Sequence, residues 1–416
     1  MTNFTRGAVR RAMQQGGLAG RNRSNVGTRI FDGRTAATFA VDGVSGTTFH
    51  GVFRIAQDPE WIEPIFANGS TSVPFTIADW RASVVTDASD LNNNAGSWSL
   101  SGGSTVVGVA RGAVRRKLVK GAQVVLPPRV RTDGGAETLV AIRGTIAAGA
   151  GSITILGNGA NGTDDLTNWA TRPDGILHAF RAQTGAHVSA LTGFTSTANV
   201  SYCPIVGLRY GCKGRVITVW SFDDSIGSGR GTYKGDGFFY PAIRRVSNRE
   251  KIAIEYACCA WAGANPTAIA DHTRDAIADG FLPEIAFTPI GSPNVANAPL
   301  IDAHIEASRS MFASARAAVL EAGGIHIPRT WAATNPAQKD WNASDALRRA
   351  LNREVMARLP AGEPVLDIAT VLAGAIDADG QELMIDGGTS DNIHPNDWAN
   401  ALASNLVDPI LRSFVG

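Results

Sequence analysis

Five short apolar runs follow one another after residue 215, and a stretch long enough to form a helix separates each run from the next. The runs are RVITVWS, REKIAIEYACC, PEIAFTPI, GIHIPRTWA and EPVLDIA. Antiparallel neighbours in a sheet need only a tight turn between them, whereas parallel neighbours need a right-handed crossover of about a dozen residues or more. The spacing therefore predicts an α/β domain over residues 214–416, with a parallel sheet covered by helices on both faces.

The clearest predicted helix lies between the third and fourth runs. The segment IDAHIEASRSMFASARAAVLEAGG has apolar residues at helical spacing and ends in Gly323-Gly324, which is typical of a helix stop. A last helical stretch, ANALASNLVDPILRSF, closes the domain. In sheets of this kind the ligand site lies at the carboxyl ends of the strands. The residues that follow each run are therefore the candidates for function.

The first half of the chain has a different rhythm. Residues 36–213 contain β-prone runs such as STVVGVA, ETLVAIRGTI and GSITILG, broken by clusters of Gly, Asn, Asp and Pro. This pattern predicts a β-sandwich-like accessory region, built as one domain or as two subdomains. Residues 1–35 hold seven arginines against one acidic residue, Asp32. We expect this basic arm to be either a solvated, disordered tail or an arm that docks on an acidic partner.

The overall composition argues against several classes of protein. The 416 residues are 44% hydrophobic and 18% charged, with a net charge of +1. This balance is typical of a soluble globular protein and provides no field that would attract nucleic acid, and no run of about 18 apolar residues predicts a membrane span. The arginines near the start are not followed by the apolar block of a signal peptide. We therefore expect a cytoplasmic or a virion- or prophage-associated protein, with its oligomeric state open.

Four cysteines are too few and too unevenly spaced for a disulfide framework. Cys258 and Cys259 end an apolar run, so we expect buried small hydrophobes rather than reactive thiols. Cys203 and Cys212 could form a disulfide only in an oxidising compartment, and we do not predict one. The spacings do not match the paired cysteines of a zinc site, and we predict neither a metal nor a cofactor.

The first run ends abruptly in Asp223-Asp224-Ser225, followed by Ile226-Gly227-Ser228-Gly229. A serine at a strand-to-helix turn exposes its hydroxyl and places its N–H near the positive end of a helix, which suits a nucleophile whose attack creates an oxyanion. Serines and aspartates also cap helices for structural reasons. Taken alone, this segment favours the cap.

A second polar block follows the last strand and precedes the final helix. It contains Asp391 and His394, three residues apart. A carboxylate at this spacing can fix the imidazole tautomer and support the cation that forms when the histidine accepts a proton. Because this block is expected at the same sheet edge as Ser225, the two together favour a Ser-His-Asp triad over two unrelated caps.

These two blocks make the second half of the chain similar to the SGNH, or GDSL-type, hydrolases. That family has a Gly-Asp-Ser block after the first strand and an Asp-x-x-His block near the end of the domain. Ser225 and Asp224 match the first block and Asp391 and His394 match the second, whereas Asp223 stands where the family has glycine. The resemblance implies a flavodoxin-like three-layer α/β/α fold and an esterase that acts through an acyl-serine.

The resemblance also implies an oxyanion hole, which in this family uses three donors. They correspond here to the backbone N–H of Ser225, the backbone N–H of Gly263 after the second strand, and the side-chain amide of Asn294 after the third. The block around Asn294 departs from the family's Gly-x-Asn-Asp pattern, so Asn297 is kept as a weaker alternative. Taken alone, Gly263 and Asn294 would be ordinary turn residues.

Fewer sequence features indicate the substrate than indicate the triad. Trp220, Trp261 and Trp331 stand near the ends of three strands, where they either pack or bind substrate together with Asp224. A β-rich module in front of such a domain resembles carbohydrate esterases of this family, which implies short acyl esters, above all acetyl esters on a glycan. Two alternatives stay open: a lipase or lysophospholipase-type esterase, and a non-catalytic glycan-binding or virion structural protein with a degenerate hydrolase domain.

Overall fold

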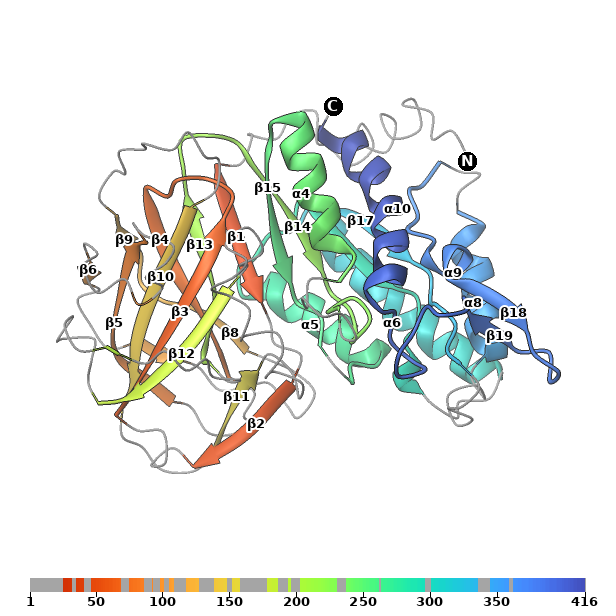
Figure 1. Cartoon of the computed structure of the whole chain (residues 1–416), viewed down its shortest axis with the longest axis horizontal. Coiled ribbons are helices and arrows are strands. Elements are labelled where there is room, and N and C mark those ends of the chain that lie inside the picture. Colours follow the sequence, from red (N-terminus) through yellow and green to blue (C-terminus); the bar gives the residue numbers. More distant parts are fainter. Residues whose placement is uncertain are drawn as a thin grey trace. The chain divides into compact units, whose positions relative to one another are not determined.

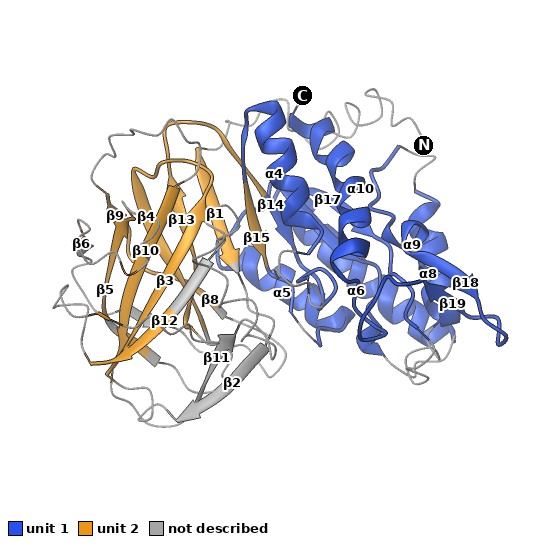
Figure 2. Ribbon diagram, in the orientation of Figure 1, with its two compact units in different colours: residues 1–22, 219–254, 259–416 blue, residues 23–218, 255–258 orange. Residues whose placement is uncertain are grey.

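The computed structural model divides the chain into two compact units, which Figure 2 colours separately. Unit 1 takes in residues 219–254 and 259–416, and unit 2 takes in residues 23–218 and 255–258. The predicted basic arm lies largely outside the described residues, although its last part contributes a strand. The described residues are 25–31, 35–40, 46–68, 75–85, 92, 98–100, 105–107, 117–126, 138–147, 152–157, 178–185, 194–195, 203–229, 237–261, 263–295, 301–335, 345–358 and 362–415.

Unit 1 is built on a parallel sheet, as the sequence predicts. Its strands lie in the order β17–β16–β14–β15, and β16 runs parallel to both β14 and β17. All residues of β14, β15 and β16 are buried, as expected of strands covered on both faces. The strands are β14 (Val216–Ser221), β15 (Ala253–Cys258), β16 (Ile285–Pro289) and β17 (Ile325–Arg329).

Helices cover both faces of this sheet and complete a three-layer α/β architecture (Figure 1). Helix α4 packs against α10, whereas α5 packs against α6 and α6 packs against α8. The first and last helices therefore share one layer and the middle helices the other, as in a flavodoxin-like domain. The helices are α4 (Phe239–Glu250), α5 (Pro266–Ala278), α6 (Asp302–Glu321), α8 (Asp345–Met356) and α10 (Asp397–Val415).

Helix α6 confirms the clearest helix prediction. Its buried residues Phe312, Ala315 and Val319 recur at intervals of three and four, which places them on one face. The helix ends where Gly323 adopts a φ of 76°, a conformation that glycine reaches without a steric penalty. A Cβ atom on the next residue, Gly324, would lie 2.3 Å from a backbone carbonyl oxygen, so this stop also needs the missing side chain.

The fifth predicted strand is wrong in its extent. In the run EPVLDIA, Leu366 forms a single parallel bridge with Arg329. Pro364 has no N–H with which to extend the ladder in one direction. In the other direction Asp367 caps the short helix α9 (Ile368–Val371). The chain therefore touches the sheet edge at one point before it turns into a helix.

Unit 2 confirms the β-rich prediction: most of its strands form two antiparallel arrays, with β13 packed against β3, and β2 pairs with β11 in a third. One sheet runs through β1, β13, β4 and β8, and the other through β12, β3, β10, β5 and β6. Residues 255–258 of β15 are counted with this unit because they lie beside β1. The strands are β1 (Val26–Phe31), β2 (Thr35–Ala40), β3 (Thr47–Ile55), β4 (Trp61–Asn68), β5 (Phe75–Val84), β6 (Ser99–Leu100), β7 (Thr105–Val107), β8 (Lys117–Lys120), β9 (Val124–Val125), β10 (Thr138–Ile146), β11 (Ser152–Gly157), β12 (His178–Thr184) and β13 (Ile205–Gly211).

Three further features belong to the described part of the chain. Among the described residues, no helix has the length and apolar character needed to cross a membrane. All four cysteines are buried and free, so Cys203 and Cys212 are not joined in a disulfide. Within the described ranges, no group of three or more His, Cys, Asp or Glu side chains is arranged to hold a metal ion.

Candidate active site

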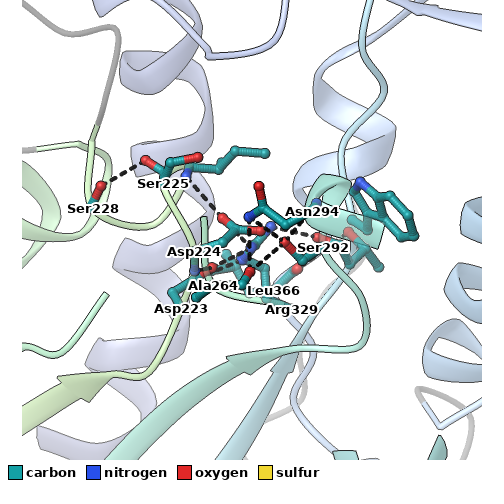
Figure 3. Close-up of polar contacts among 12 residues, drawn as sticks. Asp223, Asp224, Ser225, Ser228, Ala264, Ser292, Asn294, Arg329 and Leu366 are labelled. Carbon is teal, nitrogen blue, oxygen red and sulfur yellow. Dashed lines mark hydrogen bonds and ion pairs between the residues drawn. The ribbon is translucent and has the colours of Figure 1, made fainter. Parts of the chain in front are cut away.

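Ser225 lies in a tight turn directly after β14 (Figure 3). Asp224 Oδ1 accepts the N–H of Ile226 at 2.8 Å, and the Ser228 hydroxyl donates to Ser225 O at 2.8 Å. Helix α4 begins only at Phe239, so Ser225 is not at the helix N-terminus that the sequence led us to expect. The turn is instead held by hydrogen bonds within its own residues.

His394 connects this turn to the loop that precedes α10. Its Nε2 atom lies 2.8 Å from Ser225 Oγ, and its Nδ1 atom lies 2.5 Å from Asp391 Oδ2. If the imidazole carries its proton on Nδ1, it donates to the carboxylate and leaves Nε2 free to accept the Ser225 hydroxyl proton. Ser225 and His394 are buried, at 4% and 5% exposed. The structure therefore brings the three residues predicted as a triad into one hydrogen-bonded chain.

Asp391 is fixed by its own loop. Its Oδ1 atom accepts the backbone N–H groups of Ile393 at 3.0 Å and His394 at 2.8 Å. Partial burial raises the pKa of Asp391, but the hydrogen bonds from the His394 imidazole and the two N–H groups outweigh it and hold that pKa well below its usual range. Asn392 between them has a φ of 67°, a left-handed conformation that asparagine tolerates. The carboxylate is thus ionised and correctly aimed before any substrate binds.

The predicted oxyanion donors lie in the loops after β15 and β16. Gly263 has a φ of 86°, and a Cβ atom there would meet open space. Asn294 Nδ2 donates to Ala264 O at 2.8 Å and to Ser292 Oγ at 3.0 Å. Because Ala264 is the neighbour of Gly263, the first of these bonds joins the two loops (Figure 3). The alternative residue Asn297 lies outside the described residues.

Asp223, which stands in the glycine position of the family's block, forms a buried ion pair with Arg329 at the end of β17. Both side chains are 0% exposed. Arg329 Nε donates to Asp223 Oδ2 at 2.8 Å, and Nη2 donates to Oδ1 at 2.5 Å. Burial raises the pKa of Asp223 to about 7, against the lowering effect of the Arg329 charge. Sequence reasoning missed Arg329, although an arginine at the carboxyl end of the run GIHIPRTWA was a usable signal.

The tryptophans predicted near the site differ in exposure. Trp220 and Trp331 are 0% and 2% exposed, which favours the packing alternative for both. The ring of Trp331 lies so close to Gly291 that a Cβ atom there would be 2.6 Å away, so this ring supports the turn that leads to Asn294. Trp261 is partly exposed.

The positions of Asp224 and Trp398 also bear on substrate binding. Asp224 is 0% exposed, so its carboxylate is available to the turn rather than to a ligand. Trp398, which sequence reasoning missed, is 48% exposed in the first turn of α10. It follows His394 by four residues, and an aromatic residue this soon after the histidine block was the signal that could have found it.

Comparisons with known proteins place the likeness in half of the chain. No family model matches the chain, and no curated protein matches it. A lipolytic protein of the G-D-S-L family from Veillonella parvula shares 15% identity at a TM-score of 0.36, over 47% of this chain and 98% of its own. A carbohydrate esterase family 3 structure from Talaromyces cellulolyticus shares 15% identity at a TM-score of 0.35, over 48% and 98%. A lipase/acylhydrolase from Enterococcus faecalis shares 12% at 0.34, over 48% and 96%. At these identities and TM-scores the structural likeness says nothing about activity.

Proposed function

We propose that unit 1 is a serine esterase of the SGNH type, with Ser225 as nucleophile, His394 as general base and Asp391 as the residue that orients the imidazole. The observation that carries the proposal is the unbroken chain of hydrogen bonds from Ser225 Oγ through both ring nitrogens of His394 to Asp391. A serine hydroxyl is a weak nucleophile unless an adjacent base takes its proton during attack. This arrangement supplies that base in the tautomer that the reaction needs.

In the proposed first half-reaction, Ser225 Oγ bonds to the ester carbonyl carbon while its proton moves to His394 Nε2. The bond to the alcohol then breaks, and the leaving oxygen takes the proton from His394. In the second half-reaction, water gives a proton to the same nitrogen and attacks the acyl-serine, which releases the acid and restores Ser225. The ionised Asp391 stabilises the imidazolium in both steps.

The oxyanion of each tetrahedral intermediate needs donors aimed at one point. We infer that these are the backbone N–H groups of Ser225 and Gly263 and the side-chain amide of Asn294. Asn294 Nδ2 has two N–H groups, and its weaker partner is Ser292 Oγ at 3.0 Å, so that bond is the one we expect it to exchange for the oxyanion. Loss of one such donor costs about a hundredfold or more in turnover.

The preferred substrate in this proposal is a short acyl ester, with an acetylated carbohydrate as the leading class. Support comes from the partly exposed Trp261 in the loop after β15 and the exposed Trp398 in the first turn of α10, since an indole face can stack on a sugar ring. Metal and cofactor play no part in the proposed steps. The choice of substrate class does not affect the proposed reaction type.

The reaction type is tested with p-nitrophenyl acetate and a fluorophosphonate probe on the full-length protein. Wild type should hydrolyse the ester and become labelled at Ser225, whereas Ser225→Ala should lose both properties. Ser413→Ala is the control, because its hydroxyl is also bonded to a backbone carbonyl, that of Ile410 in α10, and plays no part in the nucleophile turn. Equal rates in wild type and Ser225→Ala would refute the proposal and favour the non-catalytic glycan-binding or virion structural alternative.

The substrate class is tested with esters from acetyl to palmitoyl and with an acetylated oligosaccharide. Turnover should fall as the acyl chain lengthens, and Trp398→Ala should raise KM for the oligosaccharide at least fivefold without changing KM for p-nitrophenyl acetate. Leu282→Ala is the control, since Leu282 is 65% exposed but precedes β16 at the opposite end of the strands. A preference for palmitoyl esters would instead support the lipase-type alternative.

A further inference from the structure

The ion pair between Asp223 and Arg329 lies within the turn that carries the nucleophile. Asp223 Oδ1 accepts the backbone N–H of Asp224 at 2.7 Å, so the carboxylate fixes the residue that precedes Ser225. On the other side of the turn, a Cβ atom on Gly227 would lie 2.2 Å from Asp223 Cγ. The carboxylate therefore fills the space that glycine at position 227 leaves open and contacts both arms of the turn.

The backbone of Asp223 reaches the loop that holds one proposed oxyanion donor. Its carbonyl oxygen accepts the N–H of Trp261 at 3.0 Å, two residues before Gly263. Asp223 is thus hydrogen-bonded both to the nucleophile turn and to the segment that leads to Gly263.

Arg329 extends the same network to the loop that holds the other donor. Its carbonyl oxygen accepts the N–H of Ile290 at 3.0 Å, at the start of the segment that leads to Ser292 and Asn294. Its Nη1 atom donates to Thr330 O at 3.0 Å, which holds the guanidinium against the end of its own strand. Arg329 thus contacts the nucleophile turn through its guanidinium and the segment that leads to Asn294 through its backbone carbonyl.

Stability alone does not account for this pair. Burying two charges costs solvation free energy that their attraction often fails to exceed, so a well-packed apolar replacement is frequently as stable. Glycine at position 223, as in the resembling family, would need no compensating arginine. Two hydrogen bonds in a planar fork do, however, define distance and direction more tightly than apolar packing does.

We propose that Asp223 and Arg329 are a positioning pair, which holds Ser225 in register with the Gly263 and Asn294 donors. This inference rests on the proposed esterase function. Neither residue touches the reacting atoms, and both act through the backbone of the turn. The pair should therefore affect kcat more than KM.

The test uses Asp223→Gly, Arg329→Met and the double variant in the full-length protein. Arg329→Met removes the partner of Asp223 and also the guanidinium that lies 3.5 Å from Asp224, whereas Asp223→Gly leaves Arg329 with Asp224 alone. Each single variant should lower both the melting temperature and kcat. The double variant should recover part of the melting temperature, because only Asp224 then lacks the guanidinium, yet its kcat for p-nitrophenyl acetate should stay at least tenfold below wild type with KM within twofold. Recovery of kcat together with the melting temperature would overturn the proposal, because a merely structural pair predicts that result.

A conservative variant and a control guard against misfolding. Asp223→Asn keeps the side-chain volume and an acceptor for the Asp224 N–H, so it should fold and retain more activity than Asp223→Gly. Wild-type kcat in Asp223→Asn would overturn the proposal. Glu255→Gln in unit 2 removes another buried carboxylate and should leave kcat unchanged.

Hydrogen exchange separates this inference from the proposed function. Amides 222–229 should exchange at least tenfold faster in the double variant than in wild type, whereas the strand amides of β16 should not change. Faster exchange in a protein whose wild type proves inactive would refute the esterase and keep the positioning pair. Unchanged exchange at 222–229 would refute the pair, whatever the activity.

Discussion

Unit 1 and unit 2 each bury an arginine beside a carboxylate, and the two pairs are organised differently. Asp223 and Arg329 in unit 1 are 0% exposed and joined by two direct hydrogen bonds. Glu255 and Arg29 in unit 2 are also buried, but the closest approach of their charged atoms is 3.9 Å. Burial raises the pKa of both carboxylates to about 7. The cost of burying the carboxylate is therefore similar, and what differs is the set of groups that compensate it.

In unit 2, the compensation is spread over several donors. Glu255 Oε2 accepts the Tyr210 hydroxyl and the Ala56 N–H, each at 3.0 Å, and Oε1 accepts the Tyr256 N–H at 3.1 Å. The Arg29 guanidinium donates to Tyr256 O at 3.1 Å rather than to the carboxylate. A carboxylate that accepts hydrogen bonds from several strands, as Glu255 does, stabilises the packing of those strands. Asp223 has two of its three hydrogen bonds from one planar guanidinium and the third from the Asp224 N–H, and this fixes its direction within the turn.

The largest effect should come from removing each arginine in turn. Arg329→Met leaves Asp223 without its main partner and should lower the free energy of unfolding by about 3–5 kcal/mol. Arg29→Met removes the nearby charge but leaves Glu255 with all three of its hydrogen-bond donors, so we expect about half that loss. Urea unfolding of both variants measures the difference, and equal losses would break the comparison.

The sequence was sufficient for the parts of unit 1 that repeat a periodic pattern. The runs that became β14 to β17, the helix α6 and the positions of Ser225, Asp391 and His394 at one sheet edge all follow from local spacing and strand order. Arg329 did not follow, because its partner Asp223 lies 106 residues earlier in the chain and neither position has a local pattern that names the other. The burial of Trp220 and Trp331 could not be predicted either. Their positions near strand ends made them substrate candidates, but sequence position does not show which way a ring points.

The two units should also differ in how their stability depends on pH, and the larger effect is expected at Glu255 in unit 2. The pKa of Glu255 is about 7 in the folded protein against an ordinary value of 4.5. A carboxyl whose pKa is raised by folding stabilises the protein while it is protonated, so that contribution is complete below pH 4.5 and is lost as the pH rises to 7. Relative to Glu255→Gln, wild type should lose about 3 kcal/mol across this interval. Calorimetry of the two proteins at pH 4.5, 6 and 8 measures it, and parallel curves would contradict it.

A buried histidine in unit 1 should act in the opposite direction. Burial, reinforced by the Arg316 and Arg358 charges, lowers the pKa of His326 from 6.5 to about 3. Its stabilising contribution is therefore complete above pH 6.5 and is lost as the pH falls toward 3, by about 1.4 kcal/mol for each pH unit. At pH 5 wild type should have lost about 2 kcal/mol relative to His326→Gln. The prediction fails if the difference between the two proteins is the same at pH 5 and pH 8.

The smallest effect should come from removing one of the donors that share Glu255. Tyr210→Phe deletes the hydroxyl that bonds to Oε2 but keeps the ring that packs against Gly27, so packing is preserved. At pH 8, where Glu255 is ionised, the lost hydrogen bond should cost about 1.5 kcal/mol. At pH 5 the carboxyl carries its own proton, needs fewer donors, and the cost should be smaller. Urea unfolding at the two pH values measures the difference, and a loss that does not change with pH would mean that Tyr210 acts by packing alone.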